Sequence, residues 1–244
     1  MSSREGIIKQ ARQLVLLLAD WFFPKECVGC GAESRWLCPE CQQQISWQPY
    51  QACLVCQSET SGKICRSHNW ALDKVIAAAD YNCPLINKLI KICKYHFSPE
   101  AAAELAALLW QFLQKQNLPP LNKGRVGVGS AIIIIPVPLS RRRLRWRGFN
   151  QAAVLAQTLA ENLQLPLNFK DLQKIKNTKP QASLLAHDRL SNLNNCFVWR
   201  GEALTNQTII LIDDVATTGA TLNECAKVLK AAGARRVWGI VAAK

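Results

Sequence analysis

Two adjacent carboxylates, Asp213 and Asp214, directly follow a run of four apolar residues, Ile209 to Ile212. A turn of small and hydroxyl-bearing residues comes next, and then a helical pattern begins. The apolar run predicts a buried parallel strand, and the two acids should lie at its open carboxyl end, where ligands of α/β sheets bind. A turn that ends at a helix N-terminus offers unpaired N–H groups to a phosphate. The segment therefore predicts a phosphate-binding site; the alternative is an ordinary strand–turn–helix with a capping threonine.

This segment, residues 208–222, resembles the phosphoribosyl diphosphate (PRPP) motif of type I phosphoribosyltransferases. The resemblance implies that Asp213 and Asp214 hold the ribose hydroxyls, partly through Mg²⁺ and its waters. It also implies that the backbone and hydroxyl groups of the following turn cradle the 5′-phosphate of PRPP. The residues of that turn are Ala216, Thr217, Thr218, Gly219, Ala220 and Thr221.

Seven of the 11 cysteines fall between Cys27 and Cys65, in pairs separated by two residues. With one histidine they make eight ligands: Cys27, Cys30, Cys38, Cys41, Cys53, Cys56, Cys65 and His68. Eight such ligands satisfy two tetrahedral, structural Zn²⁺ ions. Sequential pairing is the simplest arrangement, although an interleaved one uses the same ligands. Disulfides are the alternative, but an intracellular enzyme normally lacks them.

The net charge of +13 is unevenly distributed along the 244 residues. Residues 1–70 hold 7 Lys/Arg against 6 Asp/Glu, whereas residues 71–244 hold 23 against 11. The basic character of the second part favours polyanionic partners, either phosphorylated substrates or nucleic acid. The 49% of hydrophobic residues permits a sizeable core.

Apolar runs and helical spacings alternate after residue 70. Strands are predicted at 75–81, 131–137 and 209–212, and helices at 85–93, 99–115, 149–163 and 222–232. This alternation predicts an α/β fold in which a parallel sheet carries helices on both faces. We predict two domains: an N-terminal helix with a double zinc ribbon over 1–70, and the α/β domain over 71–244.

The most apolar stretch, residues 7–23, is interrupted by charged and amide side chains and is too short to span a membrane. It also lacks a small-residue cleavage site of the kind that ends a signal peptide. We interpret it as an amphipathic helix that packs on the zinc module. The protein is expected to be cytoplasmic, with no membrane span.

Five arginines occur within seven positions after the strand at 131–137, beside a tryptophan. Arginine offers planar, bidentate donors to phosphate oxygens, and tryptophan can stack on a base of a single strand. We predict that this segment forms a loop at the edge of the sheet; a solvated basic loop without a partner is the alternative. The residues predicted to contact nucleic acid are Arg141, Arg142, Arg143, Arg145 and Trp146.

Taken together, the segments resemble the ComF family, also called ComFC or GntX-like, over nearly the whole chain. The blocks that carry the resemblance are residues 23–27, the cysteine pairs, 92–95, 136–139, 147–152, then Thr178, Gln181, Leu184, Arg189 and Asn192, and finally 208–222. The chain departs from the family pattern at Ser140, Ala216 and His68, where histidine, valine and cysteine are usual.

The resemblance implies a type I phosphoribosyltransferase domain and a role in natural transformation, the uptake of single-stranded DNA. Asp213 and Asp214 would be the catalytic pair, and Arg147 and Lys94 would bind the diphosphate. The partners would be PRPP with Mg²⁺, single-stranded DNA and other competence proteins. Both an active transferase of unknown acceptor and a catalytically silent, PRPP-sensing DNA adaptor remain open. A plain zinc-ribbon nucleic-acid binder is disfavoured because the zinc module is close to neutral.

Overall fold

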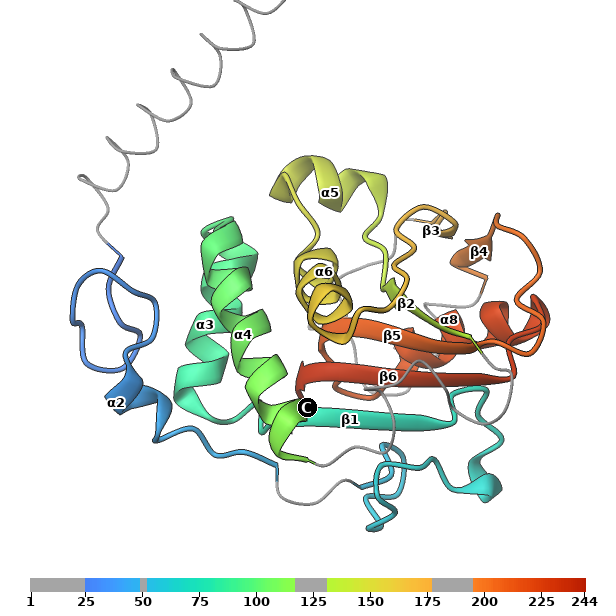
Figure 1. The fold of residues 1–244 in the computed structure, drawn as a ribbon, viewed down its shortest axis with the longest axis horizontal. Coiled ribbons are helices and arrows are strands. Elements are labelled where there is room, and N and C mark those ends of the chain that lie inside the picture. The colour runs from blue at the N-terminus through green and yellow to red at the C-terminus, as the bar shows by residue number, and fades with distance from the viewer. Residues whose placement is uncertain (1–24, 49–51, 117–130, 177–194) are drawn as a thin grey trace, which may run out of the picture. The chain divides into compact units, whose positions relative to one another are not determined.

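The computed structural model describes residues 25–48, 52–116, 131–176 and 195–244 (Figure 1). The chain forms two compact units, residues 1–45 and 46–244. The helix predicted over 7–23 and the residues quoted between 178 and 192 lie outside the described part. The domain boundary predicted between residues 70 and 71 stays a prediction.

The described part of the first unit is built mostly from turns. Its one helix, α2 (Pro39–Gln42), begins at Cys38, whose sulfur accepts a hydrogen bond from the N–H of Cys41. An antiparallel bridge joins Glu26 to Glu33 and brings the ends of the first cysteine turn together. Such short elements leave little apolar core, so this unit needs another source of stability.

The second unit contains a four-stranded parallel sheet, as the sequence predicts. Its strand order is β1 (Lys74–Ala79), β6 (Arg236–Ala243), β5 (Thr208–Val215) and β2 (Ile132–Pro136). Consecutive side chains of the central strand β5 point to opposite faces, and residues 208–212 are buried on both. An antiparallel pair, β3 (Leu172–Lys174) with β4 (Phe197–Trp199), was not predicted.

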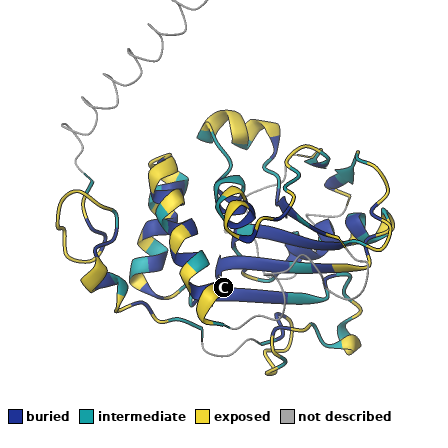
Figure 2. Ribbon diagram, viewed as in Figure 1, coloured by how far each residue is buried: buried dark blue, intermediate teal, exposed yellow. Residues whose placement is uncertain are grey.

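Helices cover both faces of this sheet (Figure 1). The helices α4 (Pro99–Lys115) and α6 (Gln151–Leu163) pack on one face, and α3 (Pro84–Tyr95) packs against α4. On the other face α8 (Ala220–Ala231) packs against β4, β5 and β6. The buried residues form the strands and the inward sides of these helices (Figure 2). A short 3₁₀ helix, η1 (Arg66–His68), lies in the second cysteine region.

The prediction of a loop after β2 is wrong, because residues 141–147 form the helix α5 (Arg141–Arg147). The hydroxyl of Ser140 accepts a hydrogen bond from the N–H of Arg143 and so caps the helix N-terminus. Gly148 ends the helix in a left-handed conformation, with φ of 77°. This capping bond explains structurally why a serine can stand at position 140, where the family usually has a histidine.

Within the described residues no helix has the length and apolar character needed to cross a membrane.

Candidate functional site

Both predicted acids lie among the last three residues of β5, the strand that pairs with β2 on one side and β6 on the other. Asp214 is buried, with 8% of its surface exposed, and Asp213 is half-buried. Because side chains alternate along a strand, the two carboxylates point to opposite faces of the sheet. Asp214 pairs with Lys94 of α3, and Asp213 follows Ile209 and Leu211 on the face of β5 that packs with residues of α8.

Lys94, in the last turn of α3, holds Asp214 in an ion pair with an Nζ–Oδ2 distance of 2.9 Å. Burial by itself lowers the pKa of Lys94, but the attraction of Asp214 and Asp213 outweighs it, and the net shift is upward. Lys94 is therefore a firmly charged cation beside the acidic pair. The structure brings this residue to the acids across more than a hundred positions of sequence.

Burial raises the pKa of Asp213 to about 7, and repulsion from Asp214 adds to the shift. Lys94 and the N–H of Asp214, which donates to Oδ1 of Asp213 at 2.9 Å, act in the opposite direction. Two carboxylates this close carry more negative charge than one lysine neutralises. When Asp213 loses its proton, the pair can take a further positive charge, either from a neighbouring side chain such as Lys174 or from a bound cation.

If the acid pair holds Mg²⁺ and PRPP, as the family resemblance implies, the affinity should fall below pH 7, because Asp213 would have to release its proton before it could help to hold the cation. A group with a pKa of about 7 lowers the affinity about tenfold for each pH unit below that value and has no effect well above it. Calorimetric titration in two buffers of different ionisation enthalpy counts the protons released on binding.

The phosphates of PRPP also titrate, so Asp213→Asn supplies the baseline for this measurement. At pH 6 the variant should release about one proton fewer than the unmodified protein. Equal proton release by both proteins would show that Asp213 is already ionised in the free state.

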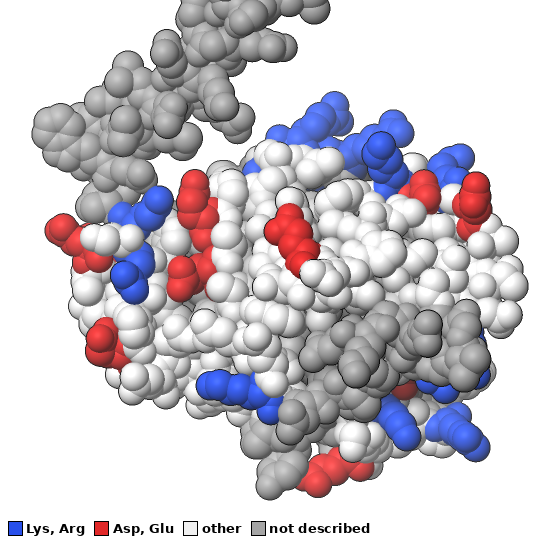
Figure 3. All heavy atoms as spheres, in the orientation of Figure 1, with Lys and Arg blue, Asp and Glu red and all other residues white. Residues whose placement is uncertain are grey.

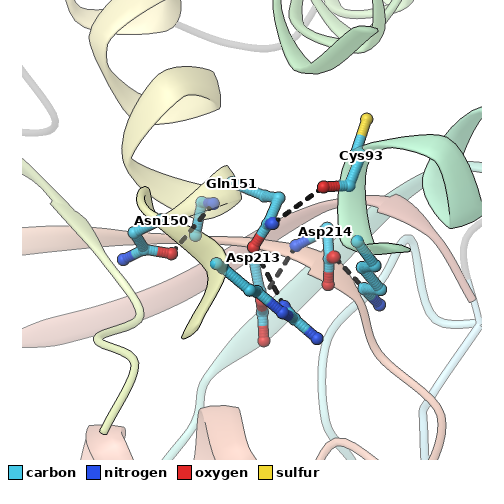
Figure 4. Close-up of polar contacts among 8 residues, drawn as sticks. Cys93, Asn150, Gln151, Asp213 and Asp214 are labelled. Atoms are coloured by element: carbon cyan, nitrogen blue, oxygen red, sulfur yellow. Dashed lines mark hydrogen bonds and ion pairs between the residues drawn. The ribbon is translucent and has the colours of Figure 1, made fainter. Parts of the chain in front are cut away.

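Arg147, the last residue of α5, donates from Nη1 to Oε1 of Gln151 at 3.0 Å. Gln151 is buried and donates in turn to the carbonyl oxygen of Cys93 at 3.0 Å (Figure 4). These bonds connect α5 to α6 and to α3, next to Lys94. The Nε of Arg147 is buried and has no hydrogen-bond partner among the described residues. A buried donor without a partner is rare, and here it is available to an anionic oxygen of a ligand.

Two further cations belong to this site, and sequence reasoning missed their position. Lys174, at the end of β3, lies in the field of Asp213, and its pKa is lowered by burial and by repulsion from Arg143. The pKa of Arg143 is lowered in its turn by burial and by Arg147. Arg143 is half-buried, and its predicted contact with nucleic acid stays a prediction. Lys174, Arg143 and Arg147 lie close enough to repel one another, and positive charge of this kind suits a diphosphate.

The predicted phosphate turn runs from Ala216 into the first turn of α8. Its Gly219 has a φ of 72°, a left-handed conformation that glycine adopts freely, and it caps α8. The first bond of the helix is donated by Asn223 to Gly219 at 2.9 Å. The N–H groups of residues 220–222 precede that bond at the start of α8, and that of Ala220 donates to the hydroxyl oxygen of Thr218 at 3.4 Å. The turn thus leads into a helix N-terminus, as the sequence predicts, and its contact with a phosphate stays a prediction.

The eight predicted zinc ligands form two groups in sequential order, Cys27, Cys30, Cys38 and Cys41, and Cys53, Cys56, Cys65 and His68. In each group the ligand atoms lie within 4.8 Å of one another. Two sulfurs bound to one tetrahedral Zn²⁺ at about 2.3 Å are about 3.7 Å apart. The sulfurs of Cys30 and Cys38 are 3.6 Å apart, and those of Cys56 and Cys65 are 3.7 Å apart.

The histidine of the second group supports the same assignment. Nε2 of His68 is buried and has no hydrogen-bond partner among the described residues. A buried imidazole nitrogen without a hydrogen-bond partner is expected when that nitrogen coordinates a metal ion. Both groups therefore fit closed, structural zinc sites.

Basic side chains gather over α5, at the top of the molecule in Figure 3. Three of its arginines are exposed, namely Arg141, Arg142 and Arg145. Trp146 is 58% exposed and meets Phe97 edge to face, with ring centroids 5.1 Å apart. Tyr95, which is 59% exposed, lies two residues before Phe97. The sequence analysis did not name Phe97, and it named Tyr95 only within the block 92–95, since only the fold brings the end of α3 to α5.

The family description "Phosphoribosyl transferase domain" matches residues 149–243, and "Double zinc ribbon domain" matches residues 18–69. Competence protein F of Haemophilus influenzae is 33% identical over 236 residues, which cover 91% of this chain and 99% of that protein. DNA utilization protein YhgH of Escherichia coli K12 is 30% identical over 232 residues, covering 93% and 92%. Competence protein ComFC of Bacillus subtilis is 37% identical over 97 residues, covering 40% and 38%.

The chain belongs to the ComF family. Its match to the double zinc ribbon includes all eight ligands and supports structural zinc in both groups. The match to the phosphoribosyltransferase domain includes the acid pair and the phosphate turn of this ComF protein. The matched segment begins at residue 149, so it includes neither Lys94 nor the arginines of α5. The fold of the whole second unit brings Lys94 to the acid pair.

Proposed function

We propose that this ComF protein binds PRPP with Mg²⁺ at the carboxyl end of β5. The observation that carries the proposal is one pair of carboxylates, Asp213 and Asp214, flanked by a phosphate turn on one side and by cations on the other. The 5′-phosphate would lie at the N–H groups of residues 216–221. The diphosphate would lie toward Lys94 and Arg147, where a buried Nε lacks a partner.

The reaction that suits this site is displacement of diphosphate from C1 of PRPP. The bond between C1 and the diphosphate oxygen breaks, the oxygen keeps the electron pair, and an acceptor nucleophile forms the new bond to C1. Positive charge develops on the ribose in the transition state, so Asp213 and Asp214 stabilise it electrostatically. Mg²⁺, when bound, would neutralise charge on the diphosphate.

The chain's own cations assist the departure of the leaving group in this proposal. Arg147 is oriented by Gln151, which keeps its guanidinium fixed before the ligand arrives. Lys94 is fixed by Asp214 in the same way. Preorganised donors of this kind stabilise developing charge without reorganisation during the reaction.

Diphosphate release from labelled PRPP in the presence of Mg²⁺ tests this function. An active transferase should release diphosphate faster when an acceptor is present, and a panel of nucleobases, amines and single-stranded oligonucleotides searches for that acceptor. Binding without release by any acceptor would favour the catalytically silent adaptor. Absence of PRPP binding by calorimetry would exclude both forms of the proposal.

A second function, binding of single-stranded DNA, is favoured by the surface of α5. Exposed arginines and the exposed ring of Trp146 combine phosphate contacts with a stacking platform. Two of the similar proteins are named for competence and one for DNA utilization. We therefore propose that this protein acts on incoming single-stranded DNA in the cytoplasm during natural transformation, together with other competence proteins.

A further inference from the structure

The second zinc group and the phosphate turn meet at Gly219. A methyl group added to Gly219 would lie 2.5 Å from Cδ1 of Leu54 and 3.1 Å from the ring of Trp70. These distances are shorter than ordinary van der Waals contact, so the side chains of Leu54 and Trp70 lie directly against the backbone of the turn at Gly219. A larger residue at position 219 would displace them, and the left-handed φ of this residue also favours glycine.

Leu54 is positioned by the metal ligands themselves. It follows Cys53 directly, within the turn that ends at Cys56, and it is buried. The N–H of Gln57 donates to the carbonyl of Cys53 at 3.0 Å and closes this turn. Leu54 belongs to the same core cluster as Ala216 and Ala220 of the phosphate turn. Leu54 thus connects the turn between Cys53 and Cys56 to the core beneath the phosphate turn.

A second contact ties the other half of this zinc group to α8. The side-chain oxygen of Asn223 is buried and accepts hydrogen bonds from the N–H groups of Ala71, at 2.9 Å, and Leu72, at 3.3 Å. These two residues follow Trp70 and the ligand His68. Asn223 also donates its own N–H to Gly219, which makes the first bond of α8. Asn223 therefore connects the segment after His68, at Ala71 and Leu72, to Gly219 in the turn.

The first zinc group differs in this respect, because it belongs to the other compact unit, residues 1–45. The second group lies in the same unit as the sheet and the phosphate turn. The two sites share a ligand chemistry, and only one of them has a described contact with Gly219.

We propose that Leu54 and Trp70 are positioning residues for the phosphate turn, and that zinc in the second group controls the affinity for a sugar 5′-phosphate. The inference rests on the proposed function, since it takes residues 216–221 as the 5′-phosphate site. A structural zinc group loses its fold when the metal leaves. Leu54 and Trp70 would then no longer support Gly219, and the N–H groups at the start of α8 would lose their fixed direction.

The metal part of the proposal is tested with two matched variants, Cys56→Ser in the second group and Cys30→Ser in the first. Both cysteines are exposed second members of a ligand pair. Each variant should lose about one zinc ion per chain by elemental analysis. Amide hydrogen exchange of peptides over 214–222 should become faster in Cys56→Ser and stay unchanged in Cys30→Ser. Equal exchange in the two variants would overturn the coupling.

The packing part is tested with Leu54→Ala and its neighbour Val55→Ala as control, since Val55 is 42% exposed in the same turn. The probes are ribose 5-phosphate, which reports the phosphate turn, and magnesium diphosphate, which reports the acids and cations. Leu54→Ala should keep both zinc ions and lower the affinity for ribose 5-phosphate about 10-fold. Its affinity for magnesium diphosphate should not change, and Val55→Ala should match the unmodified protein with both probes.

A purely structural role for Leu54 would lower both affinities together or leave both unchanged, and either result would overturn the proposal. If the unmodified protein binds magnesium diphosphate but not ribose 5-phosphate, the assignment of the phosphate turn fails and this inference fails with it. If Leu54→Ala loses zinc, Trp70→Leu repeats the test from the other side of Gly219. The hydrogen-exchange comparison needs no ligand, so it shows whether the second zinc group orders the turn even when neither probe binds. Failure of the proposed PRPP binding can therefore be told apart from failure of the coupling between zinc and the turn.

Discussion

Replacing Asp213 and Asp214 together with asparagine should lower Mg²⁺-dependent PRPP affinity by at least about 100-fold. Each substitution removes a charged partner of the ligand or its metal ion, which is worth about 1.5–3 kcal/mol in a partly buried site. Asparagine keeps the size of the side chain, and the amide can still accept a hydrogen bond from Lys94. The core beneath β5 should therefore keep its packing, and isothermal titration calorimetry should report a loss of binding rather than a loss of fold.

The matched control for this experiment is Glu161→Gln, which makes the same chemical change at an exposed position on α6. It should bind PRPP like the unmodified protein, and thermal unfolding should be cooperative for both variants. Unchanged binding heat in the doubly substituted protein would remove the acid pair from the ligand site. The proposal of a PRPP site at β5 would then be wrong.

Replacing the three exposed arginines of α5 with alanine should make the binding of single-stranded DNA weaker and less dependent on salt. The residues are Arg141, Arg142 and Arg145. Each phosphate contact with a single strand contributes about 0.7 to the slope of log affinity against log salt, so the slope should shrink by about 2. Fluorescence anisotropy of a labelled oligonucleotide between 50 and about 300 mM salt measures both quantities.

A variant with the same charge change elsewhere separates local contact from the overall field. Lys91, Lys115 and Arg236 are exposed and lie on three other elements, α3, α4 and β6. Their joint replacement by alanine should alter the slope by less than one half of the effect at α5. Equal effects in the two triple variants would show that net charge alone attracts the strand and that α5 is not the contact surface.

Trp146 gives a third, independent measurement on the same surface. Trp146→Ala should lower the affinity by about 1–3 kcal/mol without changing the salt slope, because stacking involves no phosphate. Its edge-to-face contact with Phe97 is lost in the variant, and Phe97→Ala should reproduce part of the effect. If both variants bind single-stranded DNA with unchanged affinity, the aromatic rings do not contribute and the surface binds DNA through phosphate contacts alone.

The region after β2 shows why some features could not be predicted from sequence. The sequence of α5 has no apolar face to indicate a helix, since five of its seven residues are arginines. What makes it a helix is capping at both ends, by Ser140 and by Gly148, together with the good helix propensity of arginine. Seven residues are too few for a periodic pattern, so the loop prediction followed from charge alone.

The site shows the same limit for residues that act over long sequence separations. Lys94 could be assigned to the site only by resemblance, and Lys174 was given no role in it, because a lysine in a polar segment has no pattern of its own. Both become part of the site because α3 and β3 end beside the carboxyl end of β5. The contact of Leu54 with Gly219 is likewise invisible in sequence, since 164 positions separate two residues whose types suggest only a core position and a turn.

The sequence by itself determined the class of the fold, the two groups of zinc ligands and the segment in which an acid pair ends a buried strand before a turn and a helix. It could do so because each of these depends on neighbouring residues: an apolar run, a two-residue spacing between cysteines, a turn that opens into a helix. The tertiary structure alone decided which cations lie near the acids, which arginines of α5 are exposed, and which zinc group lies against Gly219. Those properties depend on distances and burial between elements far apart in the chain, and no local pattern of residues records them.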